Sequence, residues 1–269
     1  MDTQTSHRPT KRVEDDYLLR GTGRYMADAP LPGQTYACFV RSQHACAEIK
    51  SIDAKATRAI KGVIAVITAA DIKAANVGNL SQHPPVAGRG GTKLIMPVRP
   101  ALAGDRVRHT GEAVAMVIGE TLAAAQDGAE AVEVDYAPVN AVFDLRDAVK
   151  PGAPQVWPEA PGNIAVDWAG LAPDPDANAR ALDAIFASAK HVARIACLNQ
   201  RMMANSMEPR GATATYDAAA DSYWTRTCSQ SAGAMRENMA AIMGVPKERV
   251  HVITEDVGGA FGLKTGAYP

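Results

Sequence analysis

The pattern of hydrophobic and polar positions predicts a chain of short strands separated by short helices. Segments that alternate in polarity, or that are apolar and bounded by turn residues, are typical of half-buried and buried strands. On this basis strands are expected at residues 35–42, 48–52, 62–68, 112–118, 132–136, 191–199, 211–217, 222–228 and 250–254. The two segments at residues 211–217 and 222–228 flank a turn of Ala and Asp, and they are expected to form a hairpin.

Helical spacing and capping residues predict the helices. They are expected at residues 13–20, 53–60, 121–131, 177–190 and 231–243, with a further capping-box start at Thr68 and Asp71. The order strand, helix, strand over residues 112–136 predicts a compact β-α-β arrangement. Residues 1–12 are expected to be disordered, and residues 78–100, rich in Gly and Pro, to form a long irregular loop.

A dense group of glycines follows the last predicted strand. Gly258, Gly259, Ala260, Phe261 and Gly262 form a segment whose backbone can take positive φ and approach a ligand closely. Lys264 follows, and it is expected to offer a positive charge to that ligand. The loop is interpreted either as the cradle of a phosphate or pterin-like cofactor, or as a tight turn between two strands.

Two nucleotide-binding motifs do not fit this loop. A P-loop needs a glycine directly before Lys-Ser/Thr, whereas Leu263 precedes Lys264 and Thr265. A dinucleotide fingerprint needs the spacing G-x-G-x-x-G at the start of a helix, and the glycines here lack that spacing.

Composition limits the function classes. The chain has 269 residues, enough for about two domains, and 47% hydrophobic and 21% charged residues. A net charge of −1 gives no electrostatic case for nucleic acid or an anionic membrane, and no apolar run is long enough to span a bilayer. No secretory signal is visible in the first ten residues, so a cytoplasmic location is expected.

The cysteines and histidines predict no metal site of the chain's own. The four cysteines form no C-x-x-C pair and are expected to be free thiols. None of the six histidines is paired at i, i+4 with an acid between them. Any iron–sulfur centre is therefore expected on another chain.

Several short motifs, in this order, resemble the large subunit of molybdenum hydroxylases, the xanthine dehydrogenase and aldehyde oxidase family. Residues 207–210 (MEPR), 228–230 (CSQ) and 256–264 (DVGGAFGLK) resemble its molybdopterin-binding domain. The chain also resembles the family's N-terminal a/b hammerhead domain, at residues 20–25 (RGTGRY), 39–42 (FVRS) with His44, 99–102 (RPAL), 107–112 (VRHTGE) and 134–136 (VDY). The resemblance extends from about residue 12 to the end.

The resemblance implies an α+β fold in two parts. The expected boundaries are a hammerhead domain at residues 13–146, a linker at 147–176, and a truncated N-terminal part of a mixed α/β molybdopterin-binding domain at 177–269. Gln230 matches the glutamine that lies beside the molybdenum centre in the family. The cofactor contacts implied for this chain are Gln230, Gly258, Gly259, Ala260, Phe261 and Gly262, with no catalytic residue and no metal ligand.

Two departures from the family pattern affect the prediction. Ala260 stands where the family usually has a third glycine, which is expected to tighten the loop and to limit close approach. Thr265 stands where purine-hydroxylating members have a glutamate, so purine is not the expected substrate. An aldehyde or an N-heterocycle, hydroxylated with oxygen from water, is expected instead.

The resemblance also implies partners. The family's catalytic glutamate lies far toward the C-terminus of a longer subunit, so this chain is expected to be inactive alone and to need a C-terminal molybdopterin-domain chain. The cofactor would be molybdenum–molybdopterin, with the cytosine dinucleotide form among the candidates, and iron–sulfur and FAD groups would reside on partner subunits. The alternative is a non-catalytic fragment or subunit-interaction module that binds no cofactor by itself.

Overall fold

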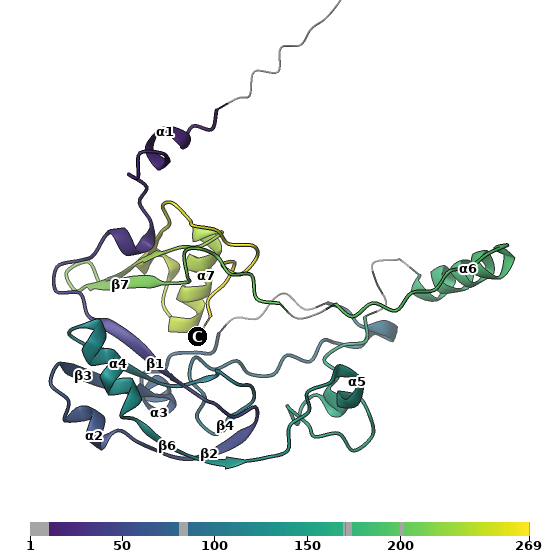
Figure 1. Cartoon of the computed structure of the whole chain (residues 1–269), viewed down its shortest axis with the longest axis horizontal. Coiled ribbons are helices and arrows are strands. Elements are labelled where there is room, and N and C mark those ends of the chain that lie inside the picture. Colours follow the sequence, from purple (N-terminus) through teal and green to yellow (C-terminus); the bar gives the residue numbers. More distant parts are fainter. Residues whose placement is uncertain (1–10, 81–85, 169, 171–173, 200–201, 269) are drawn as a thin grey trace, which may run out of the picture. The chain divides into compact units, whose positions relative to one another are not determined.

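A computed structural model of the chain describes residues 11–80, 86–168, 170, 174–199 and 202–268. The predicted disorder of residues 1–12 falls mostly outside these residues, as do positions 81–85 of the predicted long loop. The described chain forms two compact units (Figure 1). We call them the two-sheet unit, residues 35–203 with 241–244, and the one-sheet unit, residues 11–34, 204–240 and 245–267.

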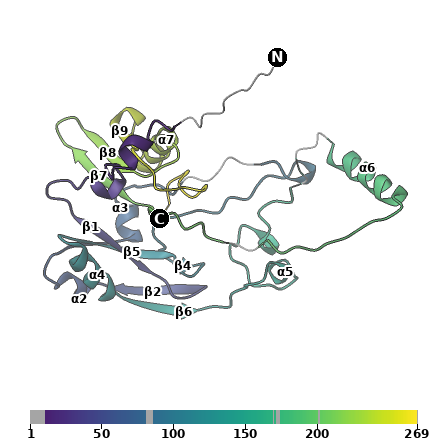
Figure 2. The same ribbon diagram turned by 45° about the horizontal axis from the view of Figure 1, so that its top comes forward.

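The two-sheet unit contains two antiparallel sheets of three strands, with orders β1-β5-β3 and β4-β2-β6. The strands are β1 (Tyr36–Arg41), β2 (Ala47–Asp53), β3 (Val63–Thr68), β4 (Arg106–Val107), β5 (Ala113–Gly119) and β6 (Glu133–Pro138). The helices are α2 (Lys55–Arg58), α3 (Ala69–Ala74), α4 (Leu122–Glu130), α5 (Leu145–Ala148) and α6 (Pro175–Ser188). Figure 2 shows β1 and β5 lying over β2 and β6.

The core of the two-sheet unit lies between its sheets. Val114 of β5, fully buried, packs with Ala47 of β2 and Val107 of β4. A second cluster joins Val66 and Val117 to residues that follow β2 and precede β6. Because β5 is buried on both faces, it reads in the sequence as a continuous apolar run. Helix α4 packs on β1 and β5, with the side chain of Thr121 capping its first turn.

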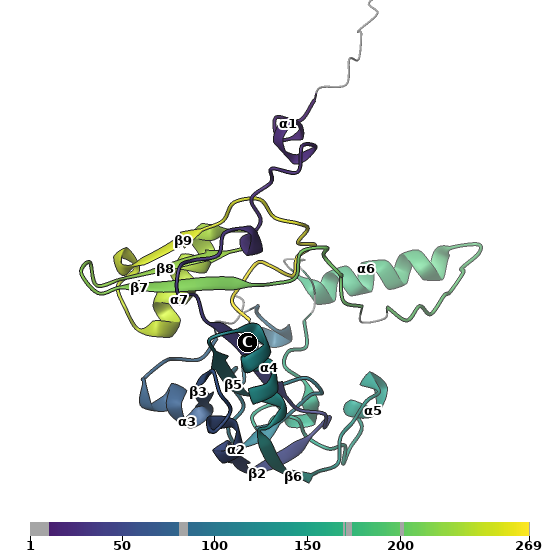
Figure 3. The same ribbon diagram turned by 60° about the vertical axis from the view of Figure 1, so that its left-hand side comes forward.

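The one-sheet unit has a single sheet of order β7-β8-β9 (Figure 3). Its elements are α1 (Asp15–Leu18), β7 (Ala212–Asp217), β8 (Ser222–Thr227), α7 (Ala232–Met243) and β9 (Val250–Ile253). Strands β7 and β8 form the predicted hairpin, whereas β8 and β9 are parallel neighbours joined through α7. Ser231 caps α7 as predicted, with its hydroxyl oxygen 3.2 Å from the N–H of Ala234, and Gly244 ends the helix with φ of 64°.

The α+β class is confirmed, and the structure corrects two local predictions. The predicted β-α-β arrangement over residues 112–136 is wrong, because β5 and β6 belong to different sheets. Local periodicity identifies a strand but does not specify its partner. The β-α-β unit of this chain is instead β8-α7-β9. The strand predicted at residues 191–199 is also wrong, because this segment pairs with no other strand in the part of the chain that the structure describes.

Candidate functional site

Gln230 and the glycine loop lie together at one edge of the one-sheet unit. Strand β8 ends at Thr227, three residues before Gln230, and the loop follows the end of β9. Because β8 and β9 are parallel, their carboxyl ends meet at the same edge, where ligands bind in many α/β folds. The N–H of Gln230 donates to the carbonyl of Lys264 over 2.9 Å, and the N–H of Lys264 donates to Gln230 Oε1 over 3.2 Å. Direct hydrogen bonds therefore join Gln230 to Lys264, two residues beyond the last glycine of the loop.

Three residues of the loop have left-handed backbone conformations. They are Gly259 with φ of 96°, Phe261 with φ of 49° and Gly262 with φ of 83°. A Cβ atom added to Gly259 would lie 3.1 Å from Phe261 Cε2, so the ring lies over this glycine. Phe261 is 73% exposed, and its positive φ is uncommon for an aromatic residue. Such local strain is typical of segments that hold a ligand.

Ala260 fits the loop without strain. Its φ is not among the positive values found in the described chain, so an L-residue is acceptable at this position. That Ala260 tightens the loop and limits the close approach of a ligand stays a prediction. The glycines of the loop that have a left-handed backbone are Gly259 and Gly262.

Gly258 allows the loop to approach the segment that precedes β7. The N–H of Gly258 donates to Glu208 Oε2 over 2.9 Å, and the N–H of Glu208 donates to the carbonyl of Gly258 over 3.1 Å. A Cβ atom at Gly258 would lie 2.5 Å from the Cβ of Glu208, closer than two such atoms can approach. Only glycine permits this pairing of the two backbones.

Lys264 is buried rather than presented to a ligand. It is 2% exposed, and its Nζ donates to Glu208 Oε2 over 3.0 Å and to the Glu208 carbonyl over 2.8 Å. The prediction that Lys264 offers a free positive charge at the loop is therefore wrong. A buried ammonium is costly unless it is paired and hydrogen-bonded, and Glu208 supplies both forms of compensation.

Glu208 connects three segments of the one-sheet unit. Besides Gly258 and Lys264, it accepts a hydrogen bond from the N–H of Met26, at 3.2 Å from Oε1. Burial alone would raise the pKa of Glu208, but the hydrogen bonds from Gly258, Lys264 and Met26 outweigh burial and lower its pKa. Sequence reasoning assigned Glu208 no role. The available signal was an acid in the motif MEPR together with a lone lysine after the glycine loop.

A second set of contacts fastens the N-terminal segment beside the loop. Asp256 accepts hydrogen bonds from the Tyr17 hydroxyl at 2.7 Å and from the N–H of Arg24 at 2.8 Å. Both hydrogen bonds lower the pKa of Asp256, and the bond from the Arg24 N–H has the larger effect. Glu255 forms ion pairs with Arg24, at 2.9 Å, and with Arg226. An open depression of about 460 Å³ lies among these residues and Thr22.

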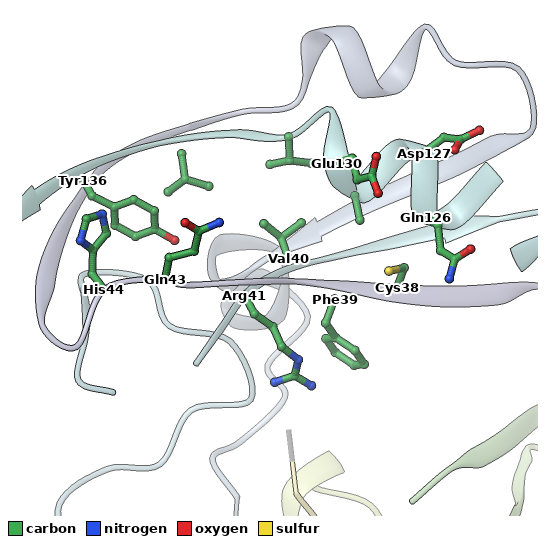
Figure 4. Close-up of a pocket in the computed structure, with 13 residues that line it drawn as sticks. Cys38, Phe39, Val40, Arg41, Gln43, His44, Gln126, Asp127, Glu130 and Tyr136 are labelled. Carbon is green, nitrogen blue, oxygen red and sulfur yellow. The ribbon is translucent and has the colours of Figure 1, made fainter. Parts of the chain in front are cut away.

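A larger depression, of about 780 Å³, lies in the two-sheet unit between β1, β6 and α4 (Figure 4). Figure 4 shows His44 beside Tyr136 at one end and Gln126, Asp127 and Glu130 at the other. Burial raises the pKa of Tyr136, whose ring packs at a tilt of 59° against that of His44, with the ring centroids 4.9 Å apart. None of the predicted cofactor contacts lines this depression, so we assign it no role in the site.

Among the described residues, no group of three His, Cys, Asp or Glu side chains is arranged to hold a metal ion. Within the same residues, no helix is both long and apolar enough to cross a membrane. All four cysteines are free thiols, two of them, Cys46 and Cys228, buried.

Two family models match most of the chain. Residues 20–140 match the aldehyde oxidase and xanthine dehydrogenase a/b hammerhead domain. Residues 156–269 match the molybdopterin cofactor-binding domain, and this range includes Gln230 and the glycine loop.

Individual relatives match nearly the whole chain. The carbon monoxide dehydrogenase large chain of Afipia carboxidovorans is 33% identical over 96% of this chain, and the nicotine 6-hydroxylase large subunit of Paenarthrobacter nicotinovorans 34% identical over 96%. Among solved structures, quinoline 2-oxidoreductase from Pseudomonas putida aligns with a TM-score of 0.82 at 31% identity, covering 95% of this chain and 31% of its own. The chain spans 31% and 30% of the length of the first two relatives.

Proposed function

The chain belongs to the molybdenum hydroxylase large-subunit family, and we propose that it supplies one wall of the molybdopterin site of such an enzyme. The observation that carries the proposal is the pair of hydrogen bonds between Gln230 and Lys264, which places the glutamine amide beside the glycine loop. The boundaries that we propose for the parts are residues 13–146, 147–176 and 177–269.

The residues at this edge fit a pterin cofactor. A Cβ atom added to Gly262 would meet nothing within 4 Å, so the loop surface is open at this point. The exposed ring of Phe261 offers a flat apolar surface for a planar ring system. Because Gln230 Oε1 already accepts from Lys264, its Nε2 is the group that can donate to a bound molecule. Gly258, Gly259, Ala260, Phe261 and Gly262 remain the proposed contacts of the loop.

The charge balance of the loop determines how it would bind an anionic cofactor. Glu208 neutralises Lys264 inside the unit, so the loop presents no net side-chain charge at its surface. Binding must therefore depend on main-chain N–H groups and on the Gln230 amide, which donate without adding charge. These donors would orient a bound cofactor.

The cofactor, when bound, would carry the two electrons of the oxidation of an aldehyde or an N-heterocycle, with water as the oxygen source. The names of two relatives refer to N-heterocycles, nicotine and quinoline, which supports that half of the proposal. Thr265, in place of a glutamate, argues against purines. In this chain the work would be binding and orientation, carried by Gln230 and the loop.

The proposed enzyme is a complex. The chain spans about a third of its relatives' length, and in this proposal the catalytic base would come from a C-terminal molybdopterin-domain polypeptide. Iron–sulfur and FAD groups would reside on further subunits. The names "large chain" and "large subunit" of the relatives are consistent with such assemblies.

Metal and pterin analysis of the complex that co-purifies with the tagged chain from its host tests the proposal. We expect molybdenum and pterin in equal amounts, near one of each per copy of the chain. The variant Gln230→Ala should retain less cofactor, whereas the control Gln126→Ala, at an exposed residue of α4, should retain the wild-type amount. A complex with neither molybdenum nor pterin would refute the proposal and would favour the alternative, a non-catalytic interaction module.

A further inference from the structure

Lys264, just beyond the glycine loop, uses its side chain and both of its main-chain polar groups in hydrogen bonds. Its side chain is 1% exposed and donates to two oxygens of Glu208, the carbonyl at 2.8 Å and Oε2 at 3.0 Å. Its carbonyl accepts from the N–H of Gln230 at 2.9 Å and from the Ser229 hydroxyl at 3.2 Å. Its N–H donates to Gln230 Oε1. Lys264 therefore connects Glu208 to Gln230.

A single oxygen of Glu208 closes the glycine loop. Oε2 accepts both from the N–H of Gly258, 2.9 Å away, and from Lys264 Nζ. Because one donor lies at the start of the loop and the other just beyond its end, this oxygen fixes the separation of the two. Oε1 accepts from the N–H of Met26, so the carboxylate cannot rotate without breaking a hydrogen bond. Hydrogen bonds to a charged group are stronger than neutral ones, so the arrangement resists local motion.

The contact with Lys264 determines which way the Gln230 amide faces. A main-chain N–H can only donate, so the group that faces it must be Oε1 rather than Nε2. Gln230 is exposed, and within the part of the chain that the structure describes its Nε2 has no hydrogen-bond partner. Nε2 is thus an available donor whose direction depends on the position of the Lys264 main chain.

We propose that Glu208 is a positioning residue of the cofactor site, which acts through Lys264 to fix the direction in which the Gln230 amide donates. The inference rests on the proposed function for the ligand of this donor, an oxygen acceptor on the cofactor. An exposed glutamine side chain otherwise samples many rotamers, and binding must then offset the entropy lost on ordering it. The contacts from Glu208 through Lys264 impose the order beforehand, which lowers the cost of binding.

Hydrogen exchange in the full chain tests the step from Glu208 to Lys264. Glu208→Asp keeps the negative charge beside Lys264, but its shorter side chain cannot reach all three donors at once. The amide of Lys264, which donates to Gln230, should then exchange at least about tenfold faster relative to the amides of β8, which report global unfolding. The control Glu237→Asp, at an acid 62% exposed and paired with Lys247, should leave this ratio unchanged.

A second variant guards against misfolding of the first. Glu208→Gln combined with Lys264→Met removes both buried charges together, which is less destabilising than removing one. The amide of residue 264 should again exchange at least about tenfold faster relative to β8. An unchanged ratio in either folded variant would overturn the inference.

A double-mutant cycle in the complex purified from the host tests the step from Lys264 to the cofactor. The rate at which pterin leaves the complex would be measured for the wild type, Glu208→Asp, Gln230→Ala and the double variant. Each single change should accelerate release by at least about fivefold, because a hydrogen bond to the cofactor is weakened or lost. The double variant should release pterin at most about twofold faster than Gln230→Ala, because Glu208 acts through Gln230.

Independent effects in this cycle would contradict the positioning role. A residue that merely stabilises the fold accelerates release by the same factor whether or not Gln230 is present, so the two single effects would multiply. Multiplication of the effects would therefore overturn the inference.

The two proposals fail in different ways. Molybdenum and pterin in a complex whose single effects multiply would refute the positioning role of Glu208 and leave the proposed function intact. A complex with neither molybdenum nor pterin would refute the proposed function. The exchange rate of the Lys264 amide in the full chain would then still decide whether Glu208 orients Gln230, with acceleration supporting that role and an unchanged ratio overturning it.

Discussion

The ammonium of Lys264 lies 3.0 Å from the carboxylate of Glu208 and 2.8 Å from the main-chain oxygen of the same residue. One glutamate thereby binds Lys264, which follows the glycine loop, through two groups, while its other contacts hold Gly258 and Met26. Glu208 thus holds the loop at Gly258 and, just beyond its other end, at Lys264. The outer surface of the loop is formed by Phe261 and Gly262, beside the Gln230 amide.

Removing one member of this buried pair should destabilise the one-sheet unit strongly. Lys264→Met and Glu208→Gln each leave a buried group without its charged partner, which costs about 3–5 kcal/mol. The change would be measured as the free energy of unfolding in urea. The exposed pair Lys247 and Glu237, 3.2 Å apart, is the control. Lys247→Met should cost less than about 1 kcal/mol, because exposed ion pairs contribute little. Equal effects of Lys264→Met and Lys247→Met would contradict the structure.

The lowered pKa of Glu208 predicts a loss of stability in acid. The folded pKa lies below the ordinary value of 4.5, so the carboxylate stabilises the fold above that pH. This contribution is lost as the pH falls through the folded pKa. Asp256 titrates in the same direction, so the loss should be shared by both residues. The urea midpoint of Glu208→Gln should therefore change less between about pH 6 and about pH 3 than that of the wild type. An unchanged pH dependence would show that Glu208 is not the titrating group.

The left-handed backbone of Gly259 makes it sensitive to substitution. Gly259→Ala would place a methyl group at positive φ and against the Phe261 ring, at a cost of about 1–2 kcal/mol or more. The control Gly266→Ala, shortly after the loop, has open space and no positive φ, and should change stability by less than about 0.5 kcal/mol. Thermal unfolding of both variants checks the difference, and an equal effect would mean that the loop has another conformation.

Two helical glycines should respond to alanine in opposite directions. A Cβ atom at Gly128 of α4 would lie 2.8 Å from Val117 Cγ1 and 2.9 Å from Val63 Cγ2, so Gly128→Ala overpacks the core and should cost about 1–3 kcal/mol. At Gly233 of α7 an added Cβ atom meets nothing within 4 Å, so Gly233→Ala should stabilise the helix by about 0.5–1 kcal/mol. Denaturant midpoints of both variants provide the measurement. A stabilised Gly128→Ala variant would refute the close packing of α4.

Strands and helices were predictable where their information is local. A few consecutive residues determine each such feature. Examples are the alternation of β7 and β8, the capping of α7 by Ser231 and the apolar sequence of β5. Pairing was not predictable in the same way, because the sequence that identifies β5 and β6 does not tell which sheet each joins. The segment at residues 191–199 has a strand pattern without a partner in the described chain.

The candidate site was predictable in outline but not in its support. Gln230 and the glycines were predicted as cofactor contacts through the family resemblance, and in the structure Gln230 is hydrogen-bonded to Lys264, just beyond the glycines. The partner of Lys264 could not be identified, because Glu208 lies 56 residues away in the sequence. A lysine after a glycine loop has the same local sequence whether its charge faces a ligand or a buried acid. Only the fold decides between these cases.

The hydrogen bonds from Tyr17 and Arg24 to Asp256 span 239 and 232 residues of sequence. A ribosome synthesises the N-terminal segment first, yet its partners at Glu208 and Asp256 emerge only near the end of this sequence. Strands β1 to β6 can pair while synthesis continues, since all their partners precede residue 139. The N-terminal segment instead has no partner for these contacts until the glycine loop has been synthesised. Tyr17, Arg24 and Met26 thus complete these contacts later than β1 to β6 can pair, and a ribosome stalled before residue 208 would leave them accessible to proteases and chaperones.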